Sequence, residues 1–114
     1  MSTMQNESLN DLTRHHLELA RTATSGRSAQ TVFGGHDHVL RQTLIALRAG
    51  SALDEHENPG EATVQVLHGH VRLVSGDTSW SGSTGDLLVV PDARHALEAD
   101  EDSAILLSVG KKNG

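Results

Sequence analysis

The 114-residue chain has no cysteine, which excludes disulfides, thiolate metal ligands and iron–sulfur clusters. Any transition-metal site must therefore use imidazole and oxygen ligands, and the sequence contains eight histidines. Aromatic residues are also scarce: the sequence contains one phenylalanine, Phe33, one tryptophan, Trp80, and no tyrosine. Nine basic residues against fifteen acidic ones give a formal net charge of −6. Without a basic patch or stacking side chains, we expect no binding to nucleic acid.

Long hydrophobic runs are missing as well. The longest apolar stretches, Leu87–Val90 and Ala104–Leu107, are far too short to cross a bilayer. The opening residues MSTMQNESLN lack the basic and apolar regions of a signal peptide. We therefore predict a soluble cytoplasmic protein that does not enter membranes. A chain of this length fits one domain with a single core.

The first structured element is predicted to be a helix over residues 9–24. Ser8 can cap it, and Asp11 lies where a carboxylate meets free backbone amides. Gly26 is suited to end it. Apolar residues and one histidine recur at helical spacing: Leu9, Leu12, His16, Leu19, Ala20 and Ala23. Residues 1–28 thus form an N-terminal helix and lead-in, with His15 solvated and His16 half-buried rather than metal-bound.

From residue 29 onward the pattern changes to short alternating segments separated by turns that contain Gly, Pro or Asp. We expect about eight or nine strands, the signature of an antiparallel sandwich or barrel. Residues 29–110 would form a single β-barrel domain, and residues 111–114 a polar tail. The assigned strands include Gln30–Phe33, His38–Leu47, Ala52–His56, Thr63–Leu67, Val71–Ser75, Thr78–Ser81, Leu87–Val90 and Ser103–Val109.

Two of these strands carry apolar residues on both faces. In His38–Leu47 this predicts burial on both sides, so that Gln42 or Arg41 would lie in the interior and need a partner or a ligand. In Ser103–Val109 it predicts a central or interface strand, and with the N-terminal helix it favours a homodimer. Trp80 would either join that interface or remain partly exposed.

Histidines recur near the strand ends. His36 and His38 flank a Gly-Gly turn and are assigned to a solvated loop. The stretch GSALDEHENPGEATVQVLHG, Gly50–Gly69, carries His56 at the end of a strand, and the stretch GDLLVVPDARHAL, Gly85–Leu97, carries His95. These last two side chains can meet only if the chain folds back on itself, as it would in a small barrel.

These two stretches resemble the two motifs of the cupin family. In the first motif Gly50, His56 and Gly69 match. In the second motif Gly85, Pro91 and His95 match, with Ala93 in place of a glycine and one residue fewer before the histidine. The resemblance implies an all-β fold, a double-stranded β-helix or jelly-roll barrel, with one N-terminal α-helix. It also implies a homodimer.

The resemblance implies a metal site in the barrel mouth, but two of its four ligands are replaced. Metal-binding cupins use two histidines and a glutamate of the first motif and one histidine of the second. Here Asn58 and Ala62 stand at the second-histidine and glutamate positions, which leaves His56 and His95. Glu61 is adjacent, but strand alternation sends it to the face opposite Ala62. A missing carboxylate would have to come from Asp54 or a bent Glu61.

Two functions follow, and the sequence leaves open whether the protein is an enzyme. In the first, His56 and His95, with Asn58 as a weak ligand, hold a divalent Fe, Mn, Zn or Ni ion in the barrel mouth. The reaction remains unassigned. In the second, a metal-free barrel binds a small polar or anionic molecule without catalysis, in a sensing or regulatory role. Additional ligand contacts would be Gln42, Arg41, Glu61 and Arg94. A third interpretation treats both histidines as structural.

Overall fold

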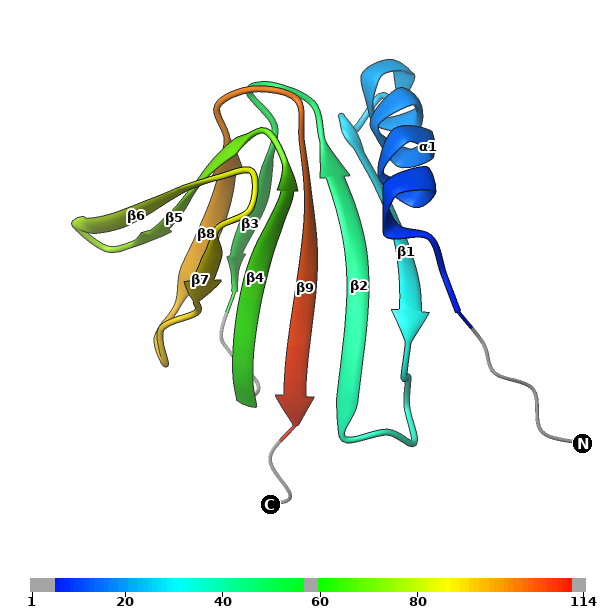
Figure 1. Ribbon diagram of the computed structural model, residues 1–114. Helices are drawn as coiled ribbons and strands as arrows, with labels where there is room; N and C mark the ends of the chain where they lie inside the picture. The colour runs from blue at the N-terminus through cyan, green and yellow to red at the C-terminus, as the bar shows by residue number, and fades with distance from the viewer. Residues whose placement is uncertain (1–5, 57–59, 112–114) are drawn as a thin grey trace, which may run out of the picture.

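The computed structural model describes residues 6–56 and 60–111, with the backbone alone at residues 55 and 56. Asn58 therefore lies outside the described residues. The described residues form one helix and nine strands (Figure 1): α1 Leu9–Thr22, β1 Arg27–Phe33, β2 Leu40–Leu47, β3 Ala52–His56, β4 Gly60–His68, β5 His70–Ser75, β6 Thr78–Ser83, β7 Leu87–Val89, β8 His95–Ala99 and β9 Ser103–Lys111.

The helix α1 begins where the sequence predicts. The side chain of Ser8 accepts a hydrogen bond from the backbone N–H of Asp11 at 3.2 Å, which satisfies one free amide of the first turn. At the other end the guanidinium of Arg48 donates to the backbone carbonyls of Arg21 and Ala23, at 3.0 and 3.2 Å. A cation there complements the negative end of the helix dipole.

The strands form two antiparallel sheets packed face to face. A five-stranded sheet has the order β1-β2-β9-β4-β7, and a four-stranded sheet has the order β3-β8-β5-β6. Several strands that are neighbours in a sheet come from distant parts of the chain, as Figure 1 shows for β2, β9 and β4. The predicted all-β jelly-roll barrel with one N-terminal helix is confirmed. The sequence assigned no strand to residues 95–99, which form β8 between β3 and β5.

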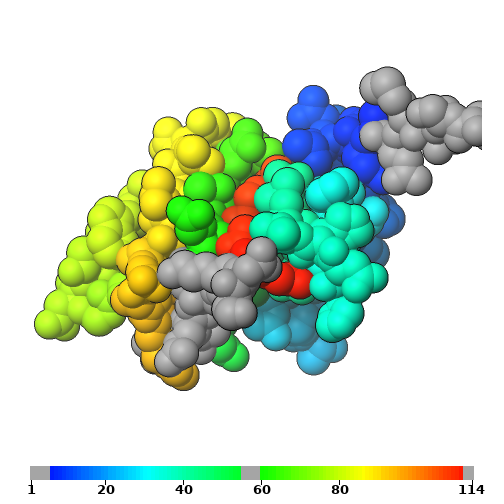
Figure 2. All heavy atoms as spheres, turned by 90° about the horizontal axis from the view of Figure 1, so that it is seen from below, coloured from blue at the N-terminus to red at the C-terminus, as the bar shows by residue number. Residues whose placement is uncertain are grey.

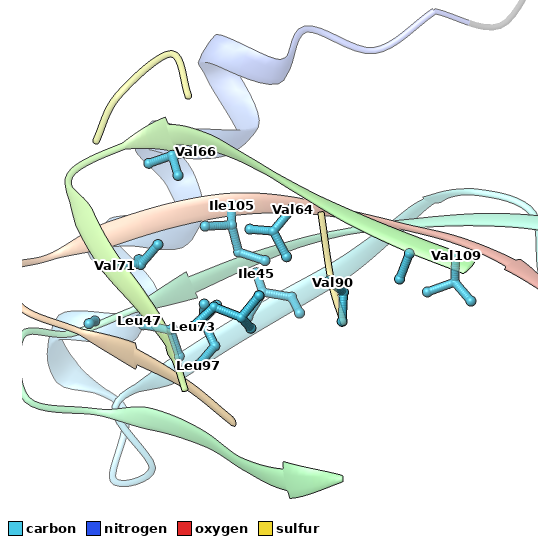
Figure 3. Close-up of a cluster of buried hydrophobic side chains, with 12 residues drawn as sticks. Ile45, Leu47, Val64, Val66, Val71, Leu73, Val90, Leu97, Ile105 and Val109 are labelled. Carbon is cyan, nitrogen blue, oxygen red and sulfur yellow. The ribbon is translucent and has the colours of Figure 1, made fainter. Parts of the chain in front are cut away.

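The core lies between the sheets and follows the two-residue period of the strands. Along β4, buried Ala62, Val64 and Val66 alternate with more exposed residues. These side chains point toward residues from the other sheet, among them Leu73 and Leu97 (Figure 3). Alternation within β4 thus selects which residues enter the barrel interior.

The outer face of the five-stranded sheet has a second, smaller core beneath α1. Leu17 and Ala20 of the helix pack on Ala46 of β2 and Ala104 of β9. This contact explains why the last strand is apolar on both faces: one face meets the barrel core and the other meets the helix of the same chain. The sequence predicted a central or interface strand, and β9 is the central strand of its sheet.

One end of the barrel gathers the motif residues. β3 ends there at His56, β4 begins at Gly60, and β8 begins at His95 (Figure 1). Figure 2 views this end, which we call the barrel mouth, with β1 and β2 on one side and the segment leading into β8 on the other. Within the described residues, the helix is neither long nor apolar enough to span a membrane.

Candidate functional site

His56 and His95 occupy directly opposite positions on β3 and β8. The pairing between these strands is regular at Leu53 and Leu97 and then shifts, so that residue 56 rather than residue 55 faces His95. Such a shift is a bulge, in which one strand carries an extra residue. Directly opposite residues of an antiparallel pair share one face of the sheet. The bulge therefore puts position 56 on the same inward face as His95.

The imidazole of His95 is buried and fixed in orientation. Its exposed fraction is 5%, and its Nδ1 lies 2.9 Å from the backbone carbonyl of Ala93. Because a carbonyl only accepts, Nδ1 donates the hydrogen in this bond. Metal-binding histidines are commonly oriented in this way by a carbonyl on their second nitrogen.

Below His95 the barrel is almost completely filled. A cavity of about 20 Å³ lies there, and among the side chains that the structure describes His95 is the one polar group that lines it. The other lining residues are Leu53, Val64, Leu73, Val90, Leu97, Ile105 and Leu107. A cavity of this size holds about one water molecule. A larger ligand must therefore bind at the mouth, above this layer.

Ala62 stands at the position of the family's glutamate; it faces inward, but its side chain is only a methyl group. Ala62 is buried in the main core and lies opposite Val109 of β9. Glu61, one residue earlier, lies opposite Gly110 and is exposed. The two residues therefore lie on opposite faces of β4, as alternation predicts.

Of the two polar candidates on β2, the register puts Arg41 on the inward face and Gln42 on the outward one. Arg41 lies opposite Val109, a member of the main core. Gln42 lies opposite Ser108, and its amide donates to the Ser108 hydroxyl at 3.0 Å. Arg41 is exposed and lies near the start of β2 rather than among its buried residues.

The remaining candidates lie around the mouth or away from it. Arg94 directly precedes β8, is exposed, and its backbone carbonyl accepts from the Ser75 hydroxyl at 2.8 Å. Asp54 is exposed on β3. His36 and His38 are exposed between β1 and β2, as predicted for a solvated loop.

The described residues do not fit the four-ligand metal site of the family. Ala62 has no donor atom, and Asn58 lies outside the described residues. Among the side chains that the structure describes, those of residues 6–54 and 60–111, no three histidine or carboxylate groups cluster closely enough to hold a metal ion. Two imidazoles alone would leave a divalent ion short of protein ligands. Any further oxygen ligands would have to come from elsewhere.

Sequence reasoning missed two polar networks because they depend on strand pairing. His16 is 5% exposed rather than half-buried, and its two ring nitrogens contact Ser28 Oγ at 2.6 Å and Gln30 Oε1 at 2.9 Å. On the outer face of the four-stranded sheet, the guanidinium of Arg72 binds Glu98 at 2.8 Å and Asp100 at 3.0 Å. The hydrogen bond and charge of Asp100, with the charge of Glu98, raise the pKa of Arg72.

Solved structures share this fold over nearly the whole chain. A conserved protein of unknown function from Streptococcus pyogenes is 24% identical, with a TM-score of 0.76 over 100% of this chain and 96% of that one. A cupin superfamily protein from Desulfitobacterium hafniense is 16% identical, with a TM-score of 0.74 over 98% and 95%. A Cupin 2 conserved barrel domain protein from Salinispora arenicola is 19% identical, with a TM-score of 0.67 over 94% and 88%.

No protein-family model matches the sequence. No curated protein matches it significantly. The similarity therefore lies in the arrangement of strands, which agrees with the motif positions at Gly50–Gly69 and Gly85–Leu97. The chain therefore has the barrel fold of the cupins, with one N-terminal helix.

Proposed function

We propose that this cupin binds a small anionic molecule at the barrel mouth, without a family-type metal site, through His56 and His95. The observation that carries the proposal is the bulged register that makes these two residues cross-strand neighbours on the inward face. Side chains that start from opposite positions lie within about 5 Å of one another at Cβ. They can therefore contact the same ligand.

The polarity of the barrel supports a ligand at the mouth rather than in the interior. His95 is the polar group at the top of an otherwise apolar layer, and the space below it accommodates about one water. A ligand above His95 would complete a site with apolar walls and few polar groups, which is typical of small-molecule sites.

The charge of the ligand is inferred from Arg41 and Ala62. Arg41 supplies a permanent positive charge on the inward face of the opposite sheet, and Ala62 replaces the only protein carboxylate of the family's site. The inward face of the mouth thus has a cation and no matching anion from these positions. A carboxylate or phosphate group would match the planar donors of the guanidinium.

A divalent metal is the second candidate, and one observation favours it. The Nδ1 of His95 donates to the Ala93 carbonyl, and a carbonyl partner of this kind commonly orients metal-binding histidines. In this version the anionic ligand would supply the oxygen atom that Ala62 does not. Enzymatic activity stays open in both versions.

The test is to purify the chain without an affinity tag, measure Fe, Mn, Zn and Ni, and identify released small molecules by mass spectrometry. We expect substoichiometric metal and an anionic molecule. Titration calorimetry with that molecule should show weaker binding for Arg41→Gln, by about tenfold or more, because a charged hydrogen bond is lost. Arg14→Gln, the same change on the exposed side of α1, is the matched control.

Substitutions of the histidines distinguish direct binding of the anion from binding through a metal ion. Near-stoichiometric metal that His56→Ala removes would favour the metal site. A metal-free protein whose ligand affinity falls in His56→Ala, but not in His68→Ala at the opposite end of β4, would favour direct binding. The proposal fails if no molecule is released and the anions tested bind Arg41→Gln as well as the unaltered chain.

A further inference from the structure

The small cavity below His95 has apolar walls. Apart from His95, the lining side chains that the structure describes are all leucine, isoleucine or valine. They come from both sheets, as Val64 does from β4 and Leu73 from β5, and both of these appear among the core side chains of Figure 3. The cavity that they enclose has a volume of about 20 Å³.

These walls suit a methyl group better than a water molecule. A buried water makes about three hydrogen bonds on average, whereas cavities with aliphatic walls stay empty. Among the described lining side chains only the imidazole of His95 is polar, and its Nδ1 already donates to the Ala93 carbonyl. An empty space deprives the side chains around it of dispersion contacts, and an apolar group of similar size would restore them.

The cavity can be reached from outside the core. Two of its lining residues, Leu53 and Leu107, are only partly buried, whereas the other six are buried. Solvent therefore touches two of the walls. A small group that enters from the mouth can reach the cavity without any strand having to separate from its neighbours.

Strand register puts the cavity one inward step below the mouth. On β9 the inward residues Leu107 and Val109 are two positions apart, and Arg41 of β2 lies opposite Val109. On β8 the same step leads from Leu97, which lines the cavity, to His95. Two residues of an extended strand span about 7 Å. The backbone of Arg41 therefore lies one such step above the cavity wall.

We propose that the ligand of the mouth is a short aliphatic carboxylate whose terminal methyl group occupies the cavity below His95. The inference rests on the proposed anion site and specifies the other end of the same ligand. The carboxylate contacts Arg41, the hydrocarbon chain passes His95, and the methyl group ends beside Leu53 and Leu107. Because C–C bonds are about 1.5 Å long, a chain of about four to six carbon atoms spans the step between the two ends.

The charge at the mouth favours a carboxylate over a phosphate monoester. Arg41 contributes one positive charge on the inward face, which a single carboxylate balances. A phosphate monoester carries a charge of about −1.5 to −2 at neutral pH. The chain already has a formal net charge of −6, so it opposes the additional negative charge of a phosphate.

A chain-length series on the unaltered protein tests the proposal. In NMR titrations with straight-chain carboxylates from acetate to octanoate, the affinity should rise by at least about tenfold to a maximum between butanoate and hexanoate. The rise is expected because each methylene that leaves water strengthens binding until the cavity is full. Equal affinity along the series, or a steady increase to octanoate, overturns the inference but leaves an anion site at the mouth.

Butyl phosphate distinguishes the two kinds of anion. We expect it to bind more weakly than pentanoate, which has a tail of the same four carbon atoms. Tighter binding of butyl phosphate overturns the assignment of a carboxylate alone. If neither anion binds, the proposed function is overturned together with the inference.

Substitutions test the two ends of the ligand separately. Val64→Leu adds one carbon to the cavity wall and should lower the affinity for pentanoate by about fivefold to tenfold. Arg41→Gln should weaken the carboxylates by similar factors and keep the preference for chain length. Val74→Leu is the matched control, because Val74 lies next to inward Leu73 on β5 and so faces outward.

Circular dichroism of each variant checks that the fold is retained. Should Val64→Leu fail to fold, Leu107→Val provides the opposite change, since it removes one carbon from the wall. It should move the affinity maximum by about one carbon atom toward longer chains. A chain-length preference that is the same in the folded cavity variant as in the unaltered chain overturns the inference.

Discussion

Arg21, in the last turn of α1, forms an ion pair with Asp102, which lies 81 residues later in the chain, and the Nε–Oδ2 distance is 3.1 Å. The other carboxylate oxygen of Asp102 accepts the backbone N–H of Ala49 at 2.9 Å. One side chain thus connects the helix, the β2–β3 turn and the start of β9. The Ala49 N–H, followed by Arg21, lowers the pKa of Asp102 below its ordinary value.

The first prediction concerns acid unfolding. Because folding lowers the pKa of Asp102, its stabilisation is fully present above the unfolded value of 3.8 and is lost as the pH falls through the lower folded value. Asp102→Asn should cost about 1–2 kcal/mol at neutral pH and flatten the loss of stability in acid. Urea unfolding at a series of pH values measures both. Parallel pH curves for the two proteins would contradict this account.

The second prediction compares neighbouring histidines. His16 is buried with both ring nitrogens in contact with Ser28 and Gln30, whereas His15 is exposed. His16→Ala should lower the free energy of unfolding by about 2–3 kcal/mol, since it leaves a cavity and two polar groups without a partner. His15→Ala should change it by less than about 0.5 kcal/mol. Equal effects in thermal or urea unfolding would show that the contacts of His16 contribute nothing.

The third prediction explains the last glycine of the first motif. Gly69 has a φ of 96°, and a Cβ there would lie 2.3 Å from the Ser103 hydroxyl oxygen and 2.5 Å from the Asp102 carbonyl oxygen. Gly69→Ala should therefore destabilise the fold by about 2–4 kcal/mol. Gly35→Ala is the control, because a Cβ at Gly35 meets nothing within 4 Å. An unfolding midpoint unchanged in Gly69→Ala would refute the steric argument.

The fourth prediction concerns a variant that restores the family's glutamate ligand at position 62. Ala62 faces the interior beside Val109, and a glutamate there would point a carboxylate into the barrel, toward the sheet that carries His56 and His95. Two histidines and one carboxylate form a facial site for a divalent metal. Ala62→Glu should bind Zn, Mn or Fe at least about tenfold more tightly than the unaltered chain, whereas Ala62→Gln should not.

The same variant has a stability readout that does not depend on activity. Without metal, Ala62→Glu should lower the unfolding temperature, because burying a carboxylate is costly. Added metal should recover that loss by binding the folded state alone. If metal shifts Ala62→Glu and Ala62→Gln equally, position 62 does not belong to a potential metal site.

Local interactions along the chain were sufficient to predict much of the fold. The cap at Ser8, the alternation of Ala62, Val64 and Val66, and the turn glycines all act through near neighbours in the sequence. They predicted one helix, a series of short strands and the resemblance to cupins. They also put Glu61 on the face opposite Ala62, which the register of β4 and β9 bears out.

The tertiary structure decided which residues face which space. Sequence alternation left Arg41 and Gln42 equivalent, and only the pairing of β2 with β9 gives Arg41 the inward position. The bulge in β3 makes residue 56, not residue 55, the neighbour of His95. Strand register depends on contacts between segments far apart in the chain, and a one-residue shift exchanges the two faces of a strand. The sequence therefore determined the elements, while long-range pairing determined the mouth that they form.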